Sequence, residues 1–185
     1  YSDEWVAEAE RRGLPNIRSM IEAVETLTTD KAVKLFEKFG IFTKAELESR
    51  EEVLYEIYAK TINIEALTMI DMASKEIVPA VIKYSKSLAD SVLAVKEAGA
   101  DAGVQTELLK EISTKLTEMK TALAKLEEAE IKAAAMENAK DQAFYYKDVV
   151  KAAMDALRKP ADELEMIVDK KVWPFPTYAD LMFEV

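Results

Sequence analysis

The stretch that decides the fold is residues 43–98, TKAELESREEVLYEIYAKTINIEALTMIDMASKEIVPAVIKYSKSLADSVLAVKEA. It contains no glycine and a single proline, Pro79. Its apolar residues recur at the three- and four-residue spacing, with one interval of seven, that places side chains on one helical face. They are Leu47, Leu54, Tyr58, Ile62, Ala66, Met69, Ala73 and Ile77. Because a helix of this length cannot bury its stripe alone, we expect the flanking segments to cover it.

The beginning of this helix and its points of bending are also predicted. Thr43, followed three residues later by Glu46, is a capping-box pattern that starts a helix. Within the helix, the β-branched cluster at residues 61–64 has weak helical propensity. Pro79 lacks an amide hydrogen, so it should kink or split the helix.

Composition favours a folded chain of a few long helices. Half of the 185 residues are hydrophobic and 32% are charged, which makes disorder improbable and allows a real core. Only 4 glycines and 5 prolines are available for turns. The chain starts at Tyr1 without a signal-like segment, so we expect a processed or excised piece of a longer protein.

Charge and missing residue types exclude several functions. A net charge of −10 disfavours nucleic acid and anionic membranes as partners. No uncharged apolar run of 18 residues exists, so a membrane span is excluded. The absence of cysteine fits a cytosolic setting, and the absence of histidine removes the commonest general base and transition-metal ligand. We predict no catalytic, cofactor-binding or metal-binding residue in this chain.

Residues 1–42 are predicted to form short helices. The first spans residues 3–12 and is ended by Gly13 and Pro15. The second is expected over residues 17–27 with Asn16 as its N-cap. A third follows a cap at residues 28–30 and stops at Gly40.

A helical hairpin is predicted after the long helix. Two glycines within residues 99–103 mark a hinge, and residues 104–158 return along the helix. The heptad seam of the returning helix is Leu109, Ile112, Leu116, Met119, Leu123 and Leu126, facing Val81, Leu88, Val92 and Val95. Whether the chain reverses or runs on at residues 131–136 is left open. The helix is expected to end at Lys159 and Pro160.

Residues 159–185 are predicted to form a short helix over 161–168 and then a tail. The tail sequence KVWPFPTY, at residues 171–178, has two prolines flanked by aromatic side chains. We expect it to be extended and packed on a surface. The whole chain is thus predicted to be one all-α domain of residues 1–185, an elongated antiparallel helical bundle.

Other motifs have structural interpretations. The acidic run Glu127, Glu128 and Glu130 is interpreted as a solvated helix face, because no calcium loop accompanies it. Residues 61–72 are apolar on more faces than one stripe needs. We therefore predict exposed apolar surface there, most of all near Ile64, Leu67 and Met72.

Several stretches together resemble the C-terminal region of type III glutamine synthetases. They are residues 12–16 (RGLPN), 36–38 (FEK), 44–50 (KAELESR), 60–66 (KTINIEA), 157–165 (LRKPADELE), 168–169 (VD) and 173–183 (WPFPTYADLMF). They occur in the family's order across nearly the whole chain.

The resemblance implies a parent enzyme, a cytoplasmic homo-oligomer of hexameric rings that makes glutamine from glutamate, ammonia and ATP with Mg²⁺ or Mn²⁺. Its catalytic barrel, metal ligands and nucleotide site would lie upstream, so this region would be a catalytically inert structural or assembly part, with the catalytic domain and neighbouring subunits as partners. The alternative is a free-standing acidic helical adaptor that binds a partner helix through the heptad seam.

Overall fold

The computed structural model describes residues 2–183, and these contain helices joined by turns and no strand. The prediction of an all-α helical protein is thereby confirmed. The chain divides into two compact units. One comprises the residues up to Thr61 together with Met136–Lys147, and the other comprises Ile62–Ala135 together with the residues from Asp148 onward.

The first unit contains the short helices α1 (Asp3–Arg11), α2 (Met20–Val24), α3 (Asp30–Lys38) and α7 (Ala139–Tyr145), the 3-10 helix η1 (Glu25–Thr28), and the beginning of α4 (Lys44–Met72). The predicted capping box starts α4: Thr43 Oγ1 accepts a bond from the Glu46 amide, and the Glu46 carboxylate accepts one from the Thr43 amide at 2.7 Å. Four buried side chains from α2, α4 and α7 form a cluster in the core of this unit: Ile21, Val24, Tyr55 and Ala143.

The predicted start of the second helix is wrong. The helix begins at Met20 with Ser19 as its N-cap, instead of at Ile17 with Asn16 as its N-cap. Ser19 Oγ accepts a hydrogen bond from the Glu22 amide at 3.3 Å, and the Glu22 carboxylate accepts one from the Arg18 amide at 3.1 Å. This reciprocal arrangement satisfies two amides at the helix start, which a cap at Asn16 would not do.

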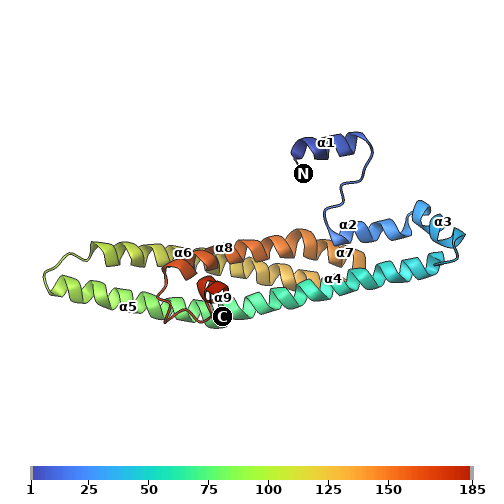
Figure 1. Ribbon diagram of the computed structural model, residues 1–185. Helices are drawn as coiled ribbons and strands as arrows, with labels where there is room; N and C mark the ends of the chain where they lie inside the picture. Colours follow the sequence, from blue (N-terminus) through green and yellow to red (C-terminus); the bar gives the residue numbers. More distant parts are fainter. Residues whose placement is uncertain (1, 184–185) are drawn as a thin grey trace. The chain divides into compact units, whose positions relative to one another are not determined.

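The second unit is built around α6 (Gly103–Ala134). This helix packs against α5 (Val78–Glu97) and against α8 (Lys151–Ile167), as Figure 1 shows. Residues 98–102 join α5 to α6, as the predicted hinge requires. The seam residues Ile112, Met119, Leu123 and Leu126 are fully buried, whereas Leu109 and Leu116 are half-buried. The predicted seam is therefore internal core, which removes the surface that the adaptor hypothesis needs.

Pro79 does not split the long helix. Six residues before it, α4 passes into the π-helix η2 (Ala73–Ile77), and α5 begins at Val78. The Val78 amide donates to the Ala73 carbonyl, five residues back instead of four. A π-turn supplies the extra room that a proline ring requires beside the preceding carbonyls. At the other expected weak point, α4 continues through residues 61–64.

The predicted helix end at Lys159 and Pro160 is also wrong. Helix α8 runs without a break from Lys151 to Ile167, with Pro160 in its interior. Pro160 is buried on the same face as Leu157 and Leu164. Packing of this continuous apolar face holds the helix together although proline cannot donate the helical hydrogen bond at its position.

The question left open at residues 131–136 is settled by two helix boundaries. Helix α6 ends at Ala134, and Asn138 begins α7 by accepting a hydrogen bond from the Asp141 amide at 3.0 Å. The π-helix η3 (Tyr146–Val150) then links α7 to α8.

Replacing Leu123 by alanine should destabilise the chain strongly, because its side chain is fully buried. We expect a loss of about 2–5 kcal/mol in the free energy of unfolding, measured by urea denaturation. Leu116→Ala, at a half-buried position of the same seam, is the matched control and should cost less. A Leu123→Ala variant as stable as the parent would contradict the assignment of the seam to the core.

Candidate functional site: the aromatic tail and the exposed face of helix α4

The tail leaves α8 through a turn that directs Trp173 inward. The Asp169 carbonyl accepts hydrogen bonds from the Val172 and Trp173 amides at 2.8 and 3.0 Å, and its carboxylate accepts one from the Lys171 amide at 2.8 Å. Trp173 is only 8% exposed. The prediction that the proline-aromatic segment packs on a surface is confirmed.

The tail ends in the short helix α9 (Tyr178–Phe183), which starts with its own capping box. The Asp180 amide donates to Thr177 Oγ1 at 3.3 Å, and the Asp180 carboxylate accepts from the Thr177 amide at 2.9 Å. The same carboxylate forms an ion pair with Lys170. The Lys170 ammonium, followed by the two bonds from Thr177, lowers the pKa of Asp180 from 3.8 to about 2.

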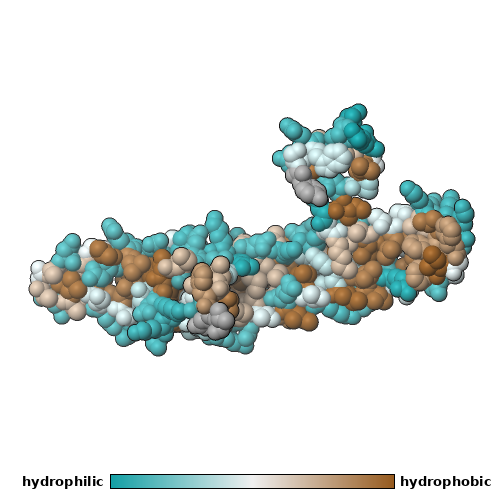
Figure 2. Space-filling model, viewed as in Figure 1, coloured by the Kyte–Doolittle hydropathy of each residue, from teal (hydrophilic) through white to brown (hydrophobic). Residues whose placement is uncertain are grey.

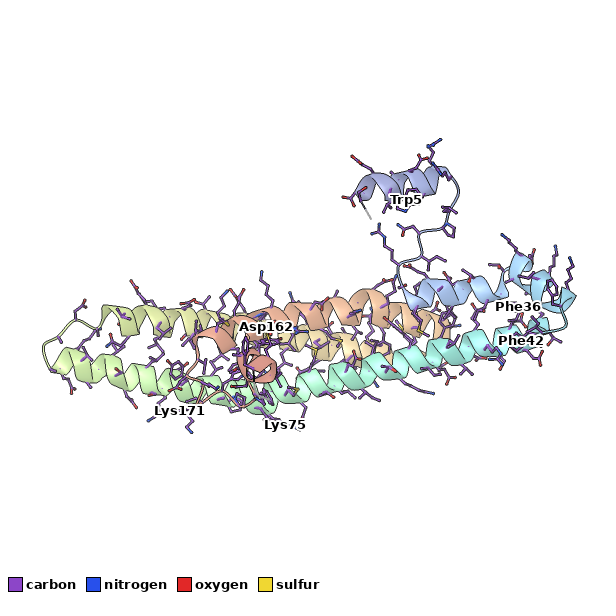
Figure 3. The ribbon with its side chains drawn as sticks, in the orientation of Figure 1. Trp5, Phe36, Phe42, Lys75, Asp162 and Lys171 are labelled. Atoms are coloured by element: carbon purple, nitrogen blue, oxygen red, sulfur yellow. The ribbon has the colours of Figure 1, made fainter. Side chains whose placement is uncertain are left out.

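Tyr178 fastens α9 to α8 through three polar contacts. Its amide donates to Glu165 Oε1 at 2.8 Å, and its hydroxyl donates to Asp162 Oδ1 at 3.1 Å. Arg158 Nη2 donates to the same hydroxyl at 2.6 Å, and this bond raises the pKa of the Arg158 guanidinium. Figure 3 labels Asp162 where α8 faces this part of the tail. We name residues 168–183 with these contacts the tail latch.

A hollow of about 450 Å³ lies beneath the tail latch. Its wall is apolar except for Arg158, Asp162 and Glu165, and the apolar lining comes from Met69, Met72, Ala73, Ile77, Leu157, Ala161, Trp173, Phe175, Pro176, Tyr178 and Leu181. The three polar side chains at its edge are engaged in the latch itself. The hollow is therefore suited to contact with an apolar group, and it presents no arrangement of nucleophile and base.

A second apolar surface lies on the last turns of α4. Ile64 is 66% exposed and Leu67 is 46% exposed, while Met72 is half-buried. These side chains, with Thr68, Ile70, Asp71, Ser74 and Lys75, line a shallow hollow of about 630 Å³. Lys75, labelled in Figure 3, is paired with Asp71 at its edge. The prediction of exposed apolar surface near Ile64 and Leu67 is confirmed, and we name this surface the α4 face.

The first unit has an apolar pocket of its own. Phe36 and Phe42 pack with ring centroids 5.6 Å apart, and the Arg50 guanidinium lies over the Phe42 ring at 4.3 Å. Both phenylalanines line a pocket of about 390 Å³ with Leu47 and Leu54. Figure 2 shows hydrophobic residues gathered over α3 and the start of α4, where Phe39 and Ile41 are exposed.

Comparison with known proteins places the chain in a family. Residues 1–96 match the model of the glutamine synthetase C-terminal domain. The chain belongs to this family. It is 39% identical over 187 residues to a glutamine synthetase of Butyrivibrio fibrisolvens, a match that covers 100% of this chain and 27% of the relative. The resemblance found in the sequence is thus confirmed.

Two further relatives agree with this assignment. A glutamine synthetase of Bacteroides fragilis (strain YCH46) is 34% identical, and a type-3 glutamine synthetase of Dictyostelium discoideum is 32% identical. Each match covers 99% of this chain and 26% of the relative. The chain therefore spans about a quarter of the length of the curated relatives that it matches.

The described residues of this glutamine synthetase C-terminal domain do not fit the divalent metals that the family resemblance implies. Between residues 2 and 183, no three His, Cys, Asp or Glu side chains converge as metal ligands would. The acidic run at Glu127, Glu128 and Glu130 belongs to no such group. That the chain has no catalytic, cofactor-binding or metal-binding residue stays a prediction. Separately, no helix in the described part of the chain is long and apolar enough to cross a membrane.

The tail latch is the part of the site that sequence reasoning did not find. Its contacts join residues up to twenty positions apart, such as Arg158 and Tyr178, and no local pattern reports such a pairing. Two local signals were present: Arg158 and Asp162 lie four residues apart on one helix, and Thr177 with Asp180 has capping-box spacing.

The tail latch should resist acid down to an unusually low pH. The pKa of Asp180 is lowered from 3.8 to about 2. The stability that the Asp180 carboxylate gives the folded tail is therefore fully present above pH 3.8 and is lost as the pH falls toward 2. In a Trp5→Phe background, the fluorescence of Trp173 should report this release. Asp180→Asn should release the tail at neutral pH as well.

Glu163→Gln is the matched control for that titration. It removes one of the two carboxylates paired with Lys115, which lies 2.7 Å from Glu163 in the same unit, and it leaves the contacts of the tail latch in place. The Trp173 signal of this variant should follow that of the parent chain. A latch that opens well above pH 3.8 in the parent, or that survives unchanged in Asp180→Asn, would contradict the role of Asp180.

Proposed function

We propose that this chain is the C-terminal structural and assembly region of a type III glutamine synthetase. The parent enzyme would make glutamine from glutamate, ammonia and ATP in the cytoplasm, using Mg²⁺ or Mn²⁺. The observation that carries the proposal is the α4 face, an exposed apolar surface in a chain that spans about a quarter of its relatives. Such a surface is typical of a contact with another protein part.

Catalysis and support would be divided between two parts of the enzyme. We assign no chemical step to this region; the chain contains no histidine or cysteine, and the described residues include no metal-ligand group. ATP, the divalent metals and both substrates would bind upstream. The contribution of the C-terminal region would be to hold the catalytic parts in position.

The partners of the α4 face would be the upstream catalytic domain or a neighbouring subunit of a homo-oligomer, which the family resemblance predicts as hexameric rings. Ile64 and Leu67 are 66% and 46% exposed, so a contact that buries them would gain only part of the roughly 1.5–3 kcal/mol that full burial of such a side chain is worth. The rim pair of Lys75 and Asp71 gives the apolar centre a polar edge, as protein interfaces commonly have.

A charge placed on the α4 face should disrupt the assembly without unfolding the region. We expect the double variant Ile64→Lys and Leu67→Lys of the full-length enzyme to sediment as smaller species. Its activity should fall in proportion to the fraction of the enzyme that is no longer assembled. The measurements are analytical ultracentrifugation and glutamine formation. Val104→Lys, at an apolar position that is more exposed than Ile64, is the matched control.

Two results would decide against the proposed role. Normal oligomers with full activity in the double variant would show that the α4 face is not an interface. Full activity and normal oligomers in an enzyme that lacks residues 1–185 would remove the assembly role altogether.

A further inference from the structure

In the N-terminal segment, residues 2–20, both ends of a helix are capped and its polar side chains are hydrogen-bonded, although no residue of the segment is buried. Ser2 caps α1 by accepting a hydrogen bond from the Trp5 amide at 3.3 Å. At the other end Gly13, with φ of 75°, allows the Gly13 amide to reach Glu10 O and the Leu14 amide to reach Ala9 O. These two bonds form a Schellman motif, which stops the helix at a defined residue.

The polar side chains of α1 are also ordered. The Glu8 carboxylate accepts from Arg11 at 2.7 Å and from Arg12 at 2.6 Å. The Arg12 guanidinium also lies 5.9 Å from the centre of the Trp5 ring. Two caps and this charge cluster specify the helix from its sequence alone.

Helix α1 nevertheless has no buried residue. An isolated helix of 9 residues is marginal in water, because nucleation costs more than so few hydrogen bonds return. Trp5 is 46% exposed, and Leu14, Ile17 and Met20 further along the segment are exposed as well. No residue from 2 to 20 is buried, so the segment contributes none of the buried residues of the first unit.

The relatives extend well beyond the stretch that they share with this chain, which makes a further part of the same polypeptide available as a partner. The relatives are nearly four times as long as the stretch that they share with this chain. The matching family is described as a C-terminal domain, and α1 lies within the matched residues. A part of the polypeptide that precedes such a domain is joined to it on its N-terminal side, which is the side of α1.

We infer that residues 2–20 fasten this region to the upstream catalytic part of the same polypeptide, with Trp5, Leu14, Ile17 and Met20 as the apolar contacts. The inference rests on the proposed function for the existence of that upstream part. It assigns the contact to a segment in the first unit, separate from the α4 face. Tryptophan and arginine are enriched among interface hot spots, and Trp5 is half exposed with the Arg12 guanidinium over its ring.

Trypsin tests the inference in the full-length enzyme, because Arg11, Arg12 and Arg18 place cleavage sites throughout the segment. Cleavage requires local opening, so a segment that is packed on the upstream part is cut slowly. We expect the double variant Trp5→Ala and Leu14→Ala to be cut there about tenfold faster than the parent enzyme, or more, which corresponds to 1.4 kcal/mol of lost contact. Val104→Ala should leave the rate unchanged.

The protection of the parent enzyme should also be independent of protein concentration, since the partner is its own polypeptide. Equal cleavage rates in the parent and the double variant would overturn the inference. Protection that disappears on dilution would overturn it too, by assigning the contact to a neighbouring subunit. The cleavage rates are measured from the peptides released, and they do not depend on the activity or the oligomeric state of the enzyme. A failure of this inference can therefore be told apart from a failure of the α4 face as an interface.

Discussion

Burial of the apolar seam of α6 is the constraint on which the second unit depends. A single helix has one stripe to bury, but α6 packs against both α5 and α8 and therefore buries side chains along most of its length. The seam is completely enclosed at Met119, Leu123 and Leu126 and becomes half-buried at Leu109. Lys115 pairs with Glu118 on its own helix and with Glu163 on α8, so one of its two ion pairs joins α6 to α8. Exposed pairs of this kind add little stability, so burial of the seam remains the main contribution.

The periodic features of the sequence predicted the structure well. The capping box at Thr43, the hinge at residues 99–103 and the seam of α6 are local patterns with one dominant physical solution, and each is found where it was expected. Ile64 and Leu67 are apolar residues that lie outside the buried stripe of α4. Their exposure was predicted for that reason.

The errors came from places where tertiary packing competes with local preference. Proline disfavours a helix interior, yet Pro160 lies within α8 because the apolar face to which it belongs is buried as a whole. Asn16 and Ser19 are both good N-caps. The helix starts after Ser19, where the Glu22 carboxylate accepts a hydrogen bond from the Arg18 amide and completes the cap. The tail latch depends on side chains that meet only after the chain has folded, so no pattern of spacing indicated Arg158 as a partner of Tyr178.

The π-helix η2 changes how the protein can vary through insertion and deletion. A π-turn holds one residue more than the α-turn that it replaces, and here it keeps Ala73, Ile77 and Val81, all four apart, on a buried side of the helix. Loss of one residue from 73–77 would turn the bond between the Val78 amide and the Ala73 carbonyl into an ordinary α-helical one, so the helix after it would keep nearly the same orientation. The same loss within the regular part of α4 or α5 would instead rotate all following residues by about 100° and turn the apolar side of the α5–α6 hairpin in a new direction. The short segment between the end of α4 and Pro79 is therefore a place where the long helix can lose one residue and keep its buried side, although Pro79 would then lose the room that the π-turn provides.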